Sequence, residues 1–474
     1  MLNARDHMAN VTYYVTSYNY FRFWRFFLPG RSLFCRPYPE LTFFIYISGS
    51  LSTPYSFFSL FKAVFKKLFA SCILFTLTVI AYSQQTTYSF SVRAITAGIT
   101  LQSLDDTATF NSAVYFLKKA RQAYTDKGYA VQTIRISTQN LYKYLGQRSY
   151  IDALPLLVKL DKIAQQNNIS LSIGQVLPPD KYQDGIADWA EQLVQNTSNI
   201  FFSLPISSHE LGIQFNSIKA SAEIIAALSK SKGGEACFRF TASANCPSNI
   251  PFFPAGFHDG VNSFGVGLES ANLITEAFKH DSNPATARQT LKSLLEKNLL
   301  PVQAIAEGIS KTLNWQYDGI DASPAPGLNA SIGQAIETYS KQPFGSPATL
   351  SACALITDVL KTLDIKRCGY SGLMLPVIED KVLAQRAAEK RYTVQELLLF
   401  SSVSGTGLDV VPLPGNTAKQ VIENILADVA ALSLKYTAKA LSARLFLIPG
   451  KNAGDVIKFD NPNLTTSVVM NAYQ

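Results

Sequence analysis

From about residue 88 onward, short apolar runs alternate with longer amphipathic segments. The short runs are rich in β-branched residues and predict strands, whereas the longer segments repeat their apolar residues at helical spacing. Ten strands are predicted, at residues 89–100, 131–137, 169–173, 200–204, 237–242, 262–269, 316–322, 372–377, 408–411 and 443–449. Helices are predicted at residues 108–127, 150–167, 184–195, 217–231, 270–279, 349–363, 379–390, 393–401 and 419–440, with two helical runs in 283–312 that break at Leu300-Pro301.

This alternation predicts an α/β fold. Strands that are separated by helices of this length are typical of parallel β-α-β units. About ten strands fit a closed barrel with surrounding helices better than an open sheet, because closure removes the unpaired edges of the sheet. Residues 84–474 contain no obvious linker and no exact internal repeat, so we expect them to form a single barrel domain.

The first 63 residues differ in composition from the rest of the chain. Eighteen of them are aromatic, and they follow neither helical nor strand periodicity. We interpret residues 1–63 as an aromatic-rich extension that is poorly structured or that precedes a mis-assigned start. A genuine membrane-associated region is the alternative, because aromatic residues are common at membrane interfaces.

Residues 64–83 have the pattern of a secretory signal peptide. Lys66 and Lys67 precede an apolar run at 68–80, and the small residues Ala81 and Ser83 stand before Gln84. We therefore expect export to the periplasm or the exterior, with transient membrane contact through this segment. The apolar run is short for a membrane-spanning helix, but it would anchor the protein if it were not cleaved.

The charge of the chain argues against nucleic acid as a partner. Residues 1–83 carry eight basic and two acidic residues, so they account for +6 of the formal net charge of +8. The remainder has no basic cluster interleaved with aromatic residues, and nucleic-acid binding is not expected. The expected partner is a small-molecule ligand or substrate, and the sequence does not set the oligomeric state.

Four cysteines follow residue 83, and none has the spacing of a zinc ligand. In an exported chain Cys237 and Cys246 are close enough in sequence to form a disulfide. Buried thiols are the alternative, above all for Cys353, which lies in an apolar helical run.

Segment 401–415 is a glycine- and proline-rich turn that presents a single acid, Asp409. Gly405 and Gly407, which follow Ser404, permit positive φ and close backbone approach. Parallel α/β folds place functional groups at the carboxyl ends of their strands, so this turn is a candidate substrate-binding segment with Asp409 as a candidate catalytic acid. A purely structural turn accounts for these residues equally well.

Three further ionisable residues are catalytic candidates: Glu269, Asp321 and His258. The two carboxylates follow apolar runs, where an acid needs a partner or a cation. Ser323, two residues after Asp321, is a candidate substrate-binding residue. His258 lies next to an acid in a glycine-bounded loop and could act as a base or a metal ligand. Their structural alternatives are a helix-capping residue, a turn residue and a surface residue, respectively.

Arg93 and Arg135 lie inside predicted strands, where an unpaired cation is costly. They are candidates for orienting an anionic group of a substrate. The alternative is that they pair with neighbouring acids and hold the barrel together.

Four short motifs carry a family resemblance: VRAITAG at 92–98, QTIRIST at 132–138, GIDASPAP at 319–326 and GTGLD at 405–409. Through them the chain resembles, over essentially residues 90–460, the uncharacterised family called domain of unknown function 711, or uncharacterised protein family 0210. The resemblance implies the fold of the pyruvate-formate-lyase-like glycyl radical enzymes, an α/β barrel of about ten strands. No reaction is established for the family, so the resemblance implies a fold rather than a function.

Two functions remain open on the sequence. The first is an exported hydrolase or lyase for a small polar substrate, with carboxylates at the barrel mouth and a divalent metal as a candidate cofactor. The second is a non-catalytic ligand-binding protein of the cell envelope. Catalysis predicts carboxylates close to one another with at least one raised pKa, whereas simple binding predicts an apolar pocket with few titratable groups.

Overall fold

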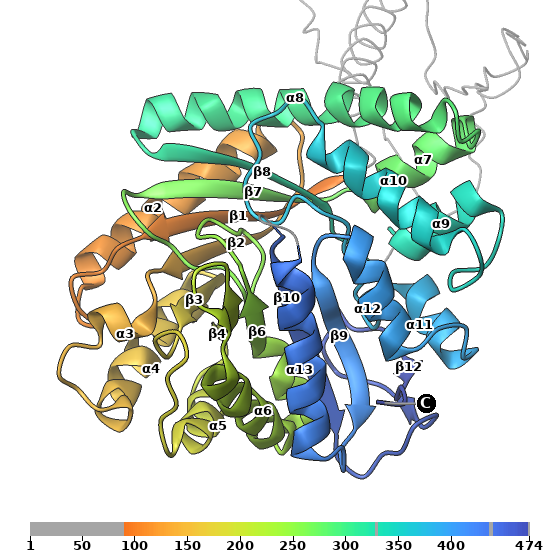
Figure 1. Cartoon of the computed structure of the whole chain (residues 1–474). Helices are drawn as coiled ribbons and strands as arrows, with labels where there is room; N and C mark the ends of the chain where they lie inside the picture. Colours follow the sequence, from red (N-terminus) through yellow and green to blue (C-terminus); the bar gives the residue numbers. More distant parts are fainter. Residues whose placement is uncertain (1–89, 328–329, 436–438, 473–474) are drawn as a thin grey trace, which may run out of the picture. The chain divides into compact units, whose positions relative to one another are not determined.

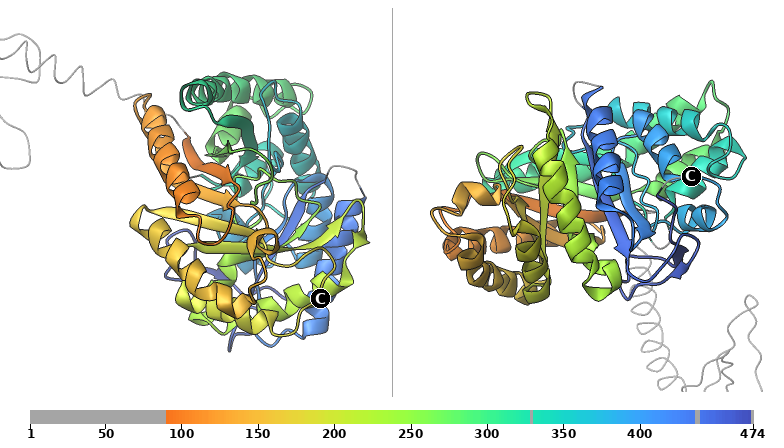
Figure 2. Two further views of the ribbon diagram at one scale, coloured as in Figure 1. Left: turned by 90° about the vertical axis from the view of Figure 1, so that its left-hand side faces the viewer. Right: turned by 60° about the horizontal axis from the view of Figure 1, so that its bottom comes forward.

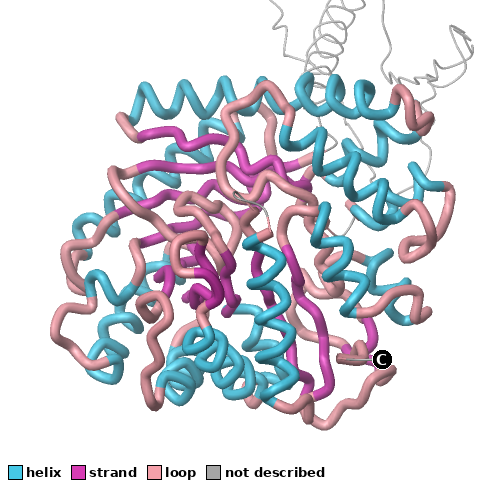
Figure 3. Tube along the Cα trace, viewed as in Figure 1, coloured by secondary structure: helices cyan, strands magenta, loops and turns pink. Residues whose placement is uncertain are grey.

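A curved sheet forms the interior of the part of the chain that the computed structural model describes, residues 90–327, 330–435 and 439–472. The helices lie on the outside of the strands (Figure 1; Figure 3), and the two further views in Figure 2 agree. These residues belong to one unit, Thr87–Gln474. The predicted N-terminal extension (1–63) and signal segment (64–83) lie outside the described residues and stay predictions.

Nine strands form a continuous ladder in the order β8-β7-β1-β2-β3-β4-β6-β10-β9, and the short β5 pairs with β4. Two further short strands, β11 and β12, pair separately with each other. The strands are β1 (Ser91–Ile99), β2 (Val131–Thr138), β3 (Ile169–Gln175), β4 (Ile200–Ser208), β5 (Gly212–Ile213), β6 (Phe240–Ala244), β7 (Ser263–Glu269), β8 (Gln316–Pro324), β9 (Gly407–Pro414), β10 (Leu441–Ile448), β11 (Val456–Ile457) and β12 (Ser467–Val468).

The outer layer consists of helices that connect these strands. Several cover the strands directly: α2 contacts β1 and β2, α6 and α13 contact β4 and β10, and α8 contacts β8. The helices are α2 (Thr107–Thr125), α3 (Leu141–Tyr144), α4 (Tyr150–Gln166), α5 (Ile186–Asn196), α6 (Phe215–Ser229), α7 (Ala271–His280), α8 (Ala287–Leu313), α9 (Ile332–Ser340), α10 (Thr349–Lys361), α11 (Lys381–Ala388), α12 (Val394–Val403) and α13 (Lys419–Leu434), with a 3₁₀ segment, η1 (Lys232–Arg239). None of the helices in the described ranges combines the length and the apolar character that a membrane crossing requires.

The sheet is mixed rather than all parallel. Strands β1, β2, β3, β4 and β6 run parallel to one another at its centre. On one side β7 joins β1 in the antiparallel sense and β8 follows it in parallel, and on the other side β10 joins β6 antiparallel and β9 follows in parallel. The α/β class is thus confirmed, while the expectation of uniformly parallel units is wrong at both flanks.

The prediction of a closed barrel is wrong, because no ladder joins the edge strands β8 and β9. The segment between Lys366 and Val377 contacts both edges instead, through one bridge from Ile320 to Arg367 and one from Pro376 to Asp409. This segment contains the strand predicted at 372–377, which does not form. The positive φ angles of Gly369 (60°) and Ser371 (41°) break its extended course, and Pro376 has no N–H to donate.

The expected helix break at Pro301 is also wrong, since α8 continues through it. Leu295, Leu299 and Val302 are buried along one side of the helix and pack it onto the core, while Leu300 is exposed. Continuous packing of this face therefore outweighs the loss of the hydrogen bond that the proline cannot donate.

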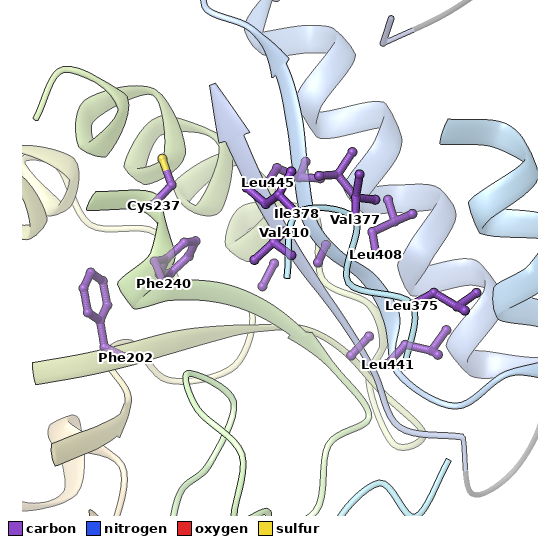
Figure 4. Packing of buried hydrophobic residues seen from close by; sticks show 14 of the residues in the cluster. Phe202, Cys237, Phe240, Leu375, Val377, Ile378, Leu408, Val410, Leu441 and Leu445 are labelled. Atoms are coloured by element: carbon purple, nitrogen blue, oxygen red, sulfur yellow. The ribbon is translucent and has the colours of Figure 1, made fainter. Parts of the chain in front are cut away.

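Apolar side chains of β6, β9, β10 and the segment 375–378 form part of one large core (Figure 4). Leu408 and Val410 of β9, Leu445 of β10 and Ile378 are fully or almost fully buried within it. Every residue of β10 is buried, which explains its nearly continuous apolar sequence, LSARLFLI. Arg444 is the one charged residue in that run and must find its partners inside the protein.

The loop between β6 and β7 lies across the central strands. The hydroxyl of Thr96 in β1 donates to the carbonyl of Pro251 (2.8 Å), and that of Ser172 in β3 donates to the carbonyl of Gly256 (2.6 Å). The backbone N–H of His258 donates to the carbonyl of Thr138 at the end of β2 (2.9 Å). These bonds fix the loop, and its phenylalanines, over the sheet.

Gly405 is placed by close backbone packing. A Cβ atom at this position would lie 3.0 Å from the carbonyl carbon of Gly372 and 3.2 Å from the nitrogen of Leu373. The N–H of Gly405 also donates to the carbonyl of Leu373 (3.1 Å), so the backbones on both sides are held in place. Glycine is therefore required here for the approach of two loops.

We predict that Gly405→Ala lowers the free energy of unfolding by about 1–3 kcal/mol, because the added methyl group overpacks this contact. The measurement is urea unfolding. Gly308→Ala is the matched control: Gly308 is an exposed residue of α8 with no atom near its would-be Cβ, so alanine should stabilise the helix by about 0.5–1 kcal/mol. Equal effects of the two substitutions would contradict the packing argument.

Candidate functional site

A cavity of about 150 Å³ lies at the sheet. Arg93, Thr133, Ser170 and Phe201 contribute to its lining, and all four stand in the amino-terminal halves of the parallel strands β1 to β4. This cavity therefore lies at the opposite ends of these strands from the carboxyl ends, where functional groups are expected from the sequence. The full lining comprises Arg93, Thr133, Arg135, Ser170, Phe201, Phe238, Thr241, Phe252, Phe253, Pro254, Ala255, Ala325, Pro326, Tyr370, Met374, Pro376, Glu379, Thr406, Asp409, Ser442, Arg444 and Asn463.

A chain of five alternating charges runs along this cavity. Arg93 lies 3.6 Å from Glu269 and 4.0 Å from Glu379. Arg444 then lies 2.8 Å from Glu379 and 2.7 Å from Asp409. The side chains are between 7% and 17% exposed, so water screens these pairs much less than it would at the surface. We call this series, from Glu269 to Asp409, the ionic chain.

Two β-bulges stand at the ionic chain. Arg93 is the extra residue of β1 against β7, where Val92 and Ala94 pair with the consecutive residues Leu268 and Gly267. On the other side, β9 has one extra residue opposite Arg444 in β10. Bulges redirect a side chain from the regular alternation of a strand, and here they stand at Arg93 and at the Asp409–Arg444 pair.

The bulge in β9 is strained. Val410, which directly follows Asp409, has a φ of 44°, a conformation that β-branched residues rarely adopt. Strain of this kind costs of the order of 1–3 kcal/mol and persists where the surroundings impose it. The full burial of the Val410 side chain in the core supplies that constraint.

Asp409 and Glu379 share one nitrogen of Arg444. Their carboxylate oxygens both lie within 2.8 Å of Nη2, so the two acids are themselves close neighbours. Burial raises the pKa of Asp409, Arg444 opposes this shift, and the like charge of Glu379 adds to it. Burial alone would lower the pKa of Arg444, but the two carboxylates more than offset it and the pKa is raised. Arg444 thus stays charged while Asp409 is disposed to take up a proton.

Arg135 lines the same cavity but lies outside the ionic chain. Its Nε donates to the hydroxyl of Thr133 (3.1 Å) and its Nη1 to the carbonyl of Pro251 (3.4 Å). Among the residues that the structure describes, no carboxylate lies within salt-bridge distance of it. Burial, followed by the repulsion of Arg93, lowers the pKa of Arg135 to about 9. At neutral pH Arg135 is therefore an enclosed cation without a counter-charge.

An aromatic wall connects the two ends of the cavity. The ring of Phe201 lies 5.6 Å from that of Phe253 and 6.1 Å from that of Phe238, measured between centroids. The guanidinium of Arg135 lies 5.3 Å from the Phe253 ring, and that of Arg444 lies 4.8 Å from the Phe238 ring. The cavity thus combines charged groups with an apolar surface, as small-molecule sites do.

Tyr370 adds a hydroxyl donor to the lining. Its hydroxyl donates to that of Ser442 (3.0 Å), and burial raises its pKa well above the usual value. The phenol therefore keeps its proton. The thiol of Cys246 lies 3.7 Å from the Tyr370 hydroxyl, and burial raises its pKa to about 12, so it has little thiolate character.

Asp321 and Ser323 lie outside the cavity lining. Both oxygens of the fully buried Asp321 accept hydrogen bonds: Oδ1 from the N–H and hydroxyl of Ser323 and the N–H of Ser371, and Oδ2 from the N–H of Tyr370. The hydroxyl of Ser323 in turn accepts from the N–H of Gly372 (3.0 Å). These bonds hold the segment that carries Tyr370 into the cavity, so Asp321 has a structural role here, within β8 rather than in a turn.

His258 lies in a second, much smaller cavity with Ser137, Ser263 and Asp318, near the carboxyl ends of β1 and β2. Its ring packs against Gly98, and its Nε2 lies 3.2 Å from the carbonyl of Gly260. Burial lowers the pKa of His258. None of the residues of this second cavity lines the first.

The glycine turn contributes only in part to the cavity. Thr406 and Asp409 line it, whereas Ser404, Gly405 and Gly407 do not. Ser404 ends α12, and a Cβ atom on Gly407, whose φ is 89°, would meet the backbone of Ser442. Glu269 lies beside the cavity, in contact with Arg93.

No metal ligand set can be assigned: in the described ranges, no three His, Cys, Asp or Glu side chains gather as a metal would require. The carboxylates of the ionic chain face arginines. Cys237, Cys246, Cys353 and Cys368 are free thiols.

The sequence analysis did not include Arg444, Tyr370 or Glu379 among its candidate site residues, and Glu379 only begins the helix predicted at 379–390. Arg444 could have been found from the sequence, because it is the one charged residue in an apolar strand. As for Arg93 and Arg135, an unpaired cation in such a strand is costly and needs a partner. At the neighbouring position, Asp380 does cap α11, and it also accepts hydrogen bonds from Ser331 and Ile332 at the start of α9. Glu379 therefore lines the cavity, whereas its neighbour Asp380 has a structural role.

The fold is that of an α/β protein whose sheet carries a cavity lined by charged and aromatic side chains. Residues 85–462 match the family described as Uncharacterised ACR (DUF711), and because this match covers most of the sequence, the chain belongs to that family. Membership names no reaction, and the pyruvate-formate-lyase-like relationship stays a prediction.

Relatives of the chain occur in archaea and bacteria. A UPF0210 protein of Pyrobaculum aerophilum is 31% identical over 282 residues, which are 56% of this chain and 60% of the relative. UPF0210 proteins of Bifidobacterium adolescentis and Methanocorpusculum labreanum are 26% identical over 399 and 402 residues, 78% of this chain and 88% of each relative. The match with the first of these proteins spans less than two thirds of that protein's length.

We predict that Arg444→Met lowers the free energy of unfolding by about 3–5 kcal/mol, because it leaves Asp409 and Glu379 buried without their shared cation. Urea unfolding measures the effect. The control is Arg288→Met, which breaks the half-exposed pair of Arg288 with Asp358 and should change stability by at most about 1 kcal/mol. If both variants are equally stable, the ionic chain does not hold the cavity together.

A second prediction concerns pH. The folded protein keeps His258 neutral below the usual pKa of 6.5, whereas the unfolded chain takes up the proton, so wild-type stability falls as pH falls below 6.5. His258→Asn removes this contribution. The unfolding temperature of the wild type, relative to that of the variant, should therefore fall between pH 7.5 and pH 5. The exposed His280 supplies the control, His280→Asn, and an equal pH response of both variants would refute the prediction.

Proposed function

We propose that the protein is an enzyme, a hydrolase or a lyase, that acts on a small polar substrate in the cavity of the ionic chain. The observation that carries this proposal is the contact of Asp409 and Glu379 with the same nitrogen of Arg444. Two adjacent acids of which one has a raised pKa are the arrangement that acid–base catalysis needs. A simple binding pocket gives no reason to bury this many titratable groups.

Asp409 is the proposed general base and acid. In its ionised form it removes a proton from the substrate or from an attacking water, and in its protonated form it returns that proton to the leaving group. Glu379 stays paired with Arg93 and Arg444 and keeps the local charge negative, which favours protonation of Asp409. The Tyr370 hydroxyl, which donates its proton to Ser442, can accept a hydrogen bond from a hydroxyl group of the substrate.

We further propose that this enzyme acts after export, or at the membrane if the N-terminal segment is retained. This part rests on the sequence pattern of residues 64–83 alone. The alternative function, a non-catalytic ligand-binding protein of the cell envelope, is supported by the aromatic wall of the cavity.

The test is a turnover screen of the full chain against small amides, esters, hydroxy acids and sugar acids, followed by proton NMR. Asp409→Asn keeps a hydrogen-bonding partner for Arg444 but cannot shuttle a proton, so it should lower kcat/KM by about 10²–10⁴-fold. Asp259→Asn, at an exposed ion pair with Lys143, should leave it unchanged. Full activity of the Asp409 variant would overturn the proposed role of this residue, and binding without turnover by the wild type would favour the ligand-binding alternative.

A further inference from the structure

The guanidinium of Arg135 has unused hydrogen-bond donors. A guanidinium carries five N–H groups, and in Arg135 one hydrogen of Nε and one of Nη1 are engaged, by Thr133 and by the carbonyl of Pro251. Nη2 has no acceptor among the residues that the structure describes. The outer edge of the guanidinium, between Nη1 and Nη2, is therefore free for a partner in the cavity that it lines.

The charges around Arg135 disfavour its protonated, positively charged form. Arg93 and Arg444 repel its charge, and the nearby Glu379 is already engaged by both of them. Other arginines have their guanidinium nitrogens engaged by the protein: Arg386 by Glu337 at 2.6 Å, and the buried Arg239 by the carbonyl and the hydroxyl of Thr197. A half-buried cation without a counter-ion is disfavoured, so its presence in the cavity lining indicates that an anion completes the site.

Charge and size restrict that anion. One free cation balances a single negative charge, and Asp409 and Glu379 in the same lining would repel a second one. A carboxylate meets this condition and matches the planar guanidinium with two parallel hydrogen bonds, whereas a phosphate dianion exceeds it. A cavity of about 150 Å³ is known to accommodate a molecule of the size of benzene.

The aromatic wall indicates what the rest of the ligand is. The Phe253 ring lies under the Arg135 guanidinium, and the Phe201 and Phe238 rings continue from it toward Arg444. A group attached to a carboxylate on Arg135 would extend along these rings. An apolar or flat body therefore fits better than a heavily hydroxylated one.

We infer that Arg135 binds the carboxylate of a small organic acid whose apolar body packs on the rings of Phe253 and Phe201. This inference rests on the proposed function only in placing the substrate in this cavity. It names the chemical class of the substrate: a monocarboxylate, with the reacting end directed from Arg135 toward Asp409 and Arg444.

Benzoate, benzamide and inorganic phosphate are the probes, and the full chain is the sample. Calorimetric titration should show that benzoate binds, with benzamide at least tenfold weaker because it lacks the charge, and phosphate weaker still. Arg135→Met should weaken benzoate binding more than tenfold and Arg135→Lys by less, since lysine keeps the charge and loses the two parallel bonds. Arg148→Met, at the exposed pair with Asp105, is the control and should bind benzoate as the wild type does.

Thermal unfolding without ligand supplies a second readout. Arg135→Met should raise the unfolding temperature, because it removes an unpaired, half-buried charge, whereas loss of a structural arginine would lower it. The inference is overturned if benzoate and benzamide bind equally well, if phosphate binds more tightly than benzoate, if no probe binds, or if the methionine variant binds like the wild type.

The outcomes separate this inference from the proposed function. Asp409→Asn should retain benzoate binding, because it removes a negative charge from the cavity and leaves Arg135 intact. If that variant also retains full turnover, the acid–base proposal fails while the carboxylate site stands. If Asp409→Asn abolishes turnover but Arg135→Met leaves both KM and benzoate affinity unchanged, the enzyme stands and the carboxylate site fails.

Discussion

Arg93, Arg135 and Arg444 line the cavity, and the positions of the carboxylates around them determine much of the architecture there. The ionic chain joins the end of β7, the start of β1, the residues after Pro376, β10 and β9. These are the elements on either side of the place where the backbone ladder is interrupted. Side-chain charges thus connect parts of the sheet that are not joined by a continuous ladder, and screening is weak because the pairs are buried.

This constraint also explains why the site is unequal at its two ends. Arg93 and Arg444 divide three carboxylates between them, which leaves Asp409 and Glu379 close together on one nitrogen and leaves Arg135 with none. One end of the cavity therefore favours an extra proton and the other favours an extra anion. The Phe253, Phe201 and Phe238 rings separate these ends by an apolar surface, which limits how far water can screen either charge.

Most helices and strands could be predicted from the sequence, because the residues that they bury are apolar and recur at regular spacing. The amphipathic α13 and the fully buried β10 are examples. The sequence could not predict the mixed strand directions. The length of the segment between two strands does not determine beside which strand of the sheet the second one pairs. The segment 372–377 looked like a strand because it is apolar, but the positive φ values before it are invisible in composition. Among the candidate site residues, Arg93, Arg135 and Asp409 line one cavity, whereas Asp321 and His258 do not line it. Bulges and loops determine which side chains of distant strands meet, and these cannot be predicted from the local sequence pattern.

Three features in the cavity lining or directly beside it oppose the stability of the fold, and they lie close together. Val410 has a strained backbone, Asp409 and Glu379 are forced onto one cation, and Arg135 is charged without a partner. Each has a simpler replacement: an unstrained residue, one acid fewer, or an apolar side chain in place of the arginine. Stability alone would favour those replacements, because proteins tolerate local conflict mainly where function requires it. All three features lie in the lining of one cavity or directly beside it. Their proximity is therefore a physical argument for the location of the site that does not depend on any assumed reaction.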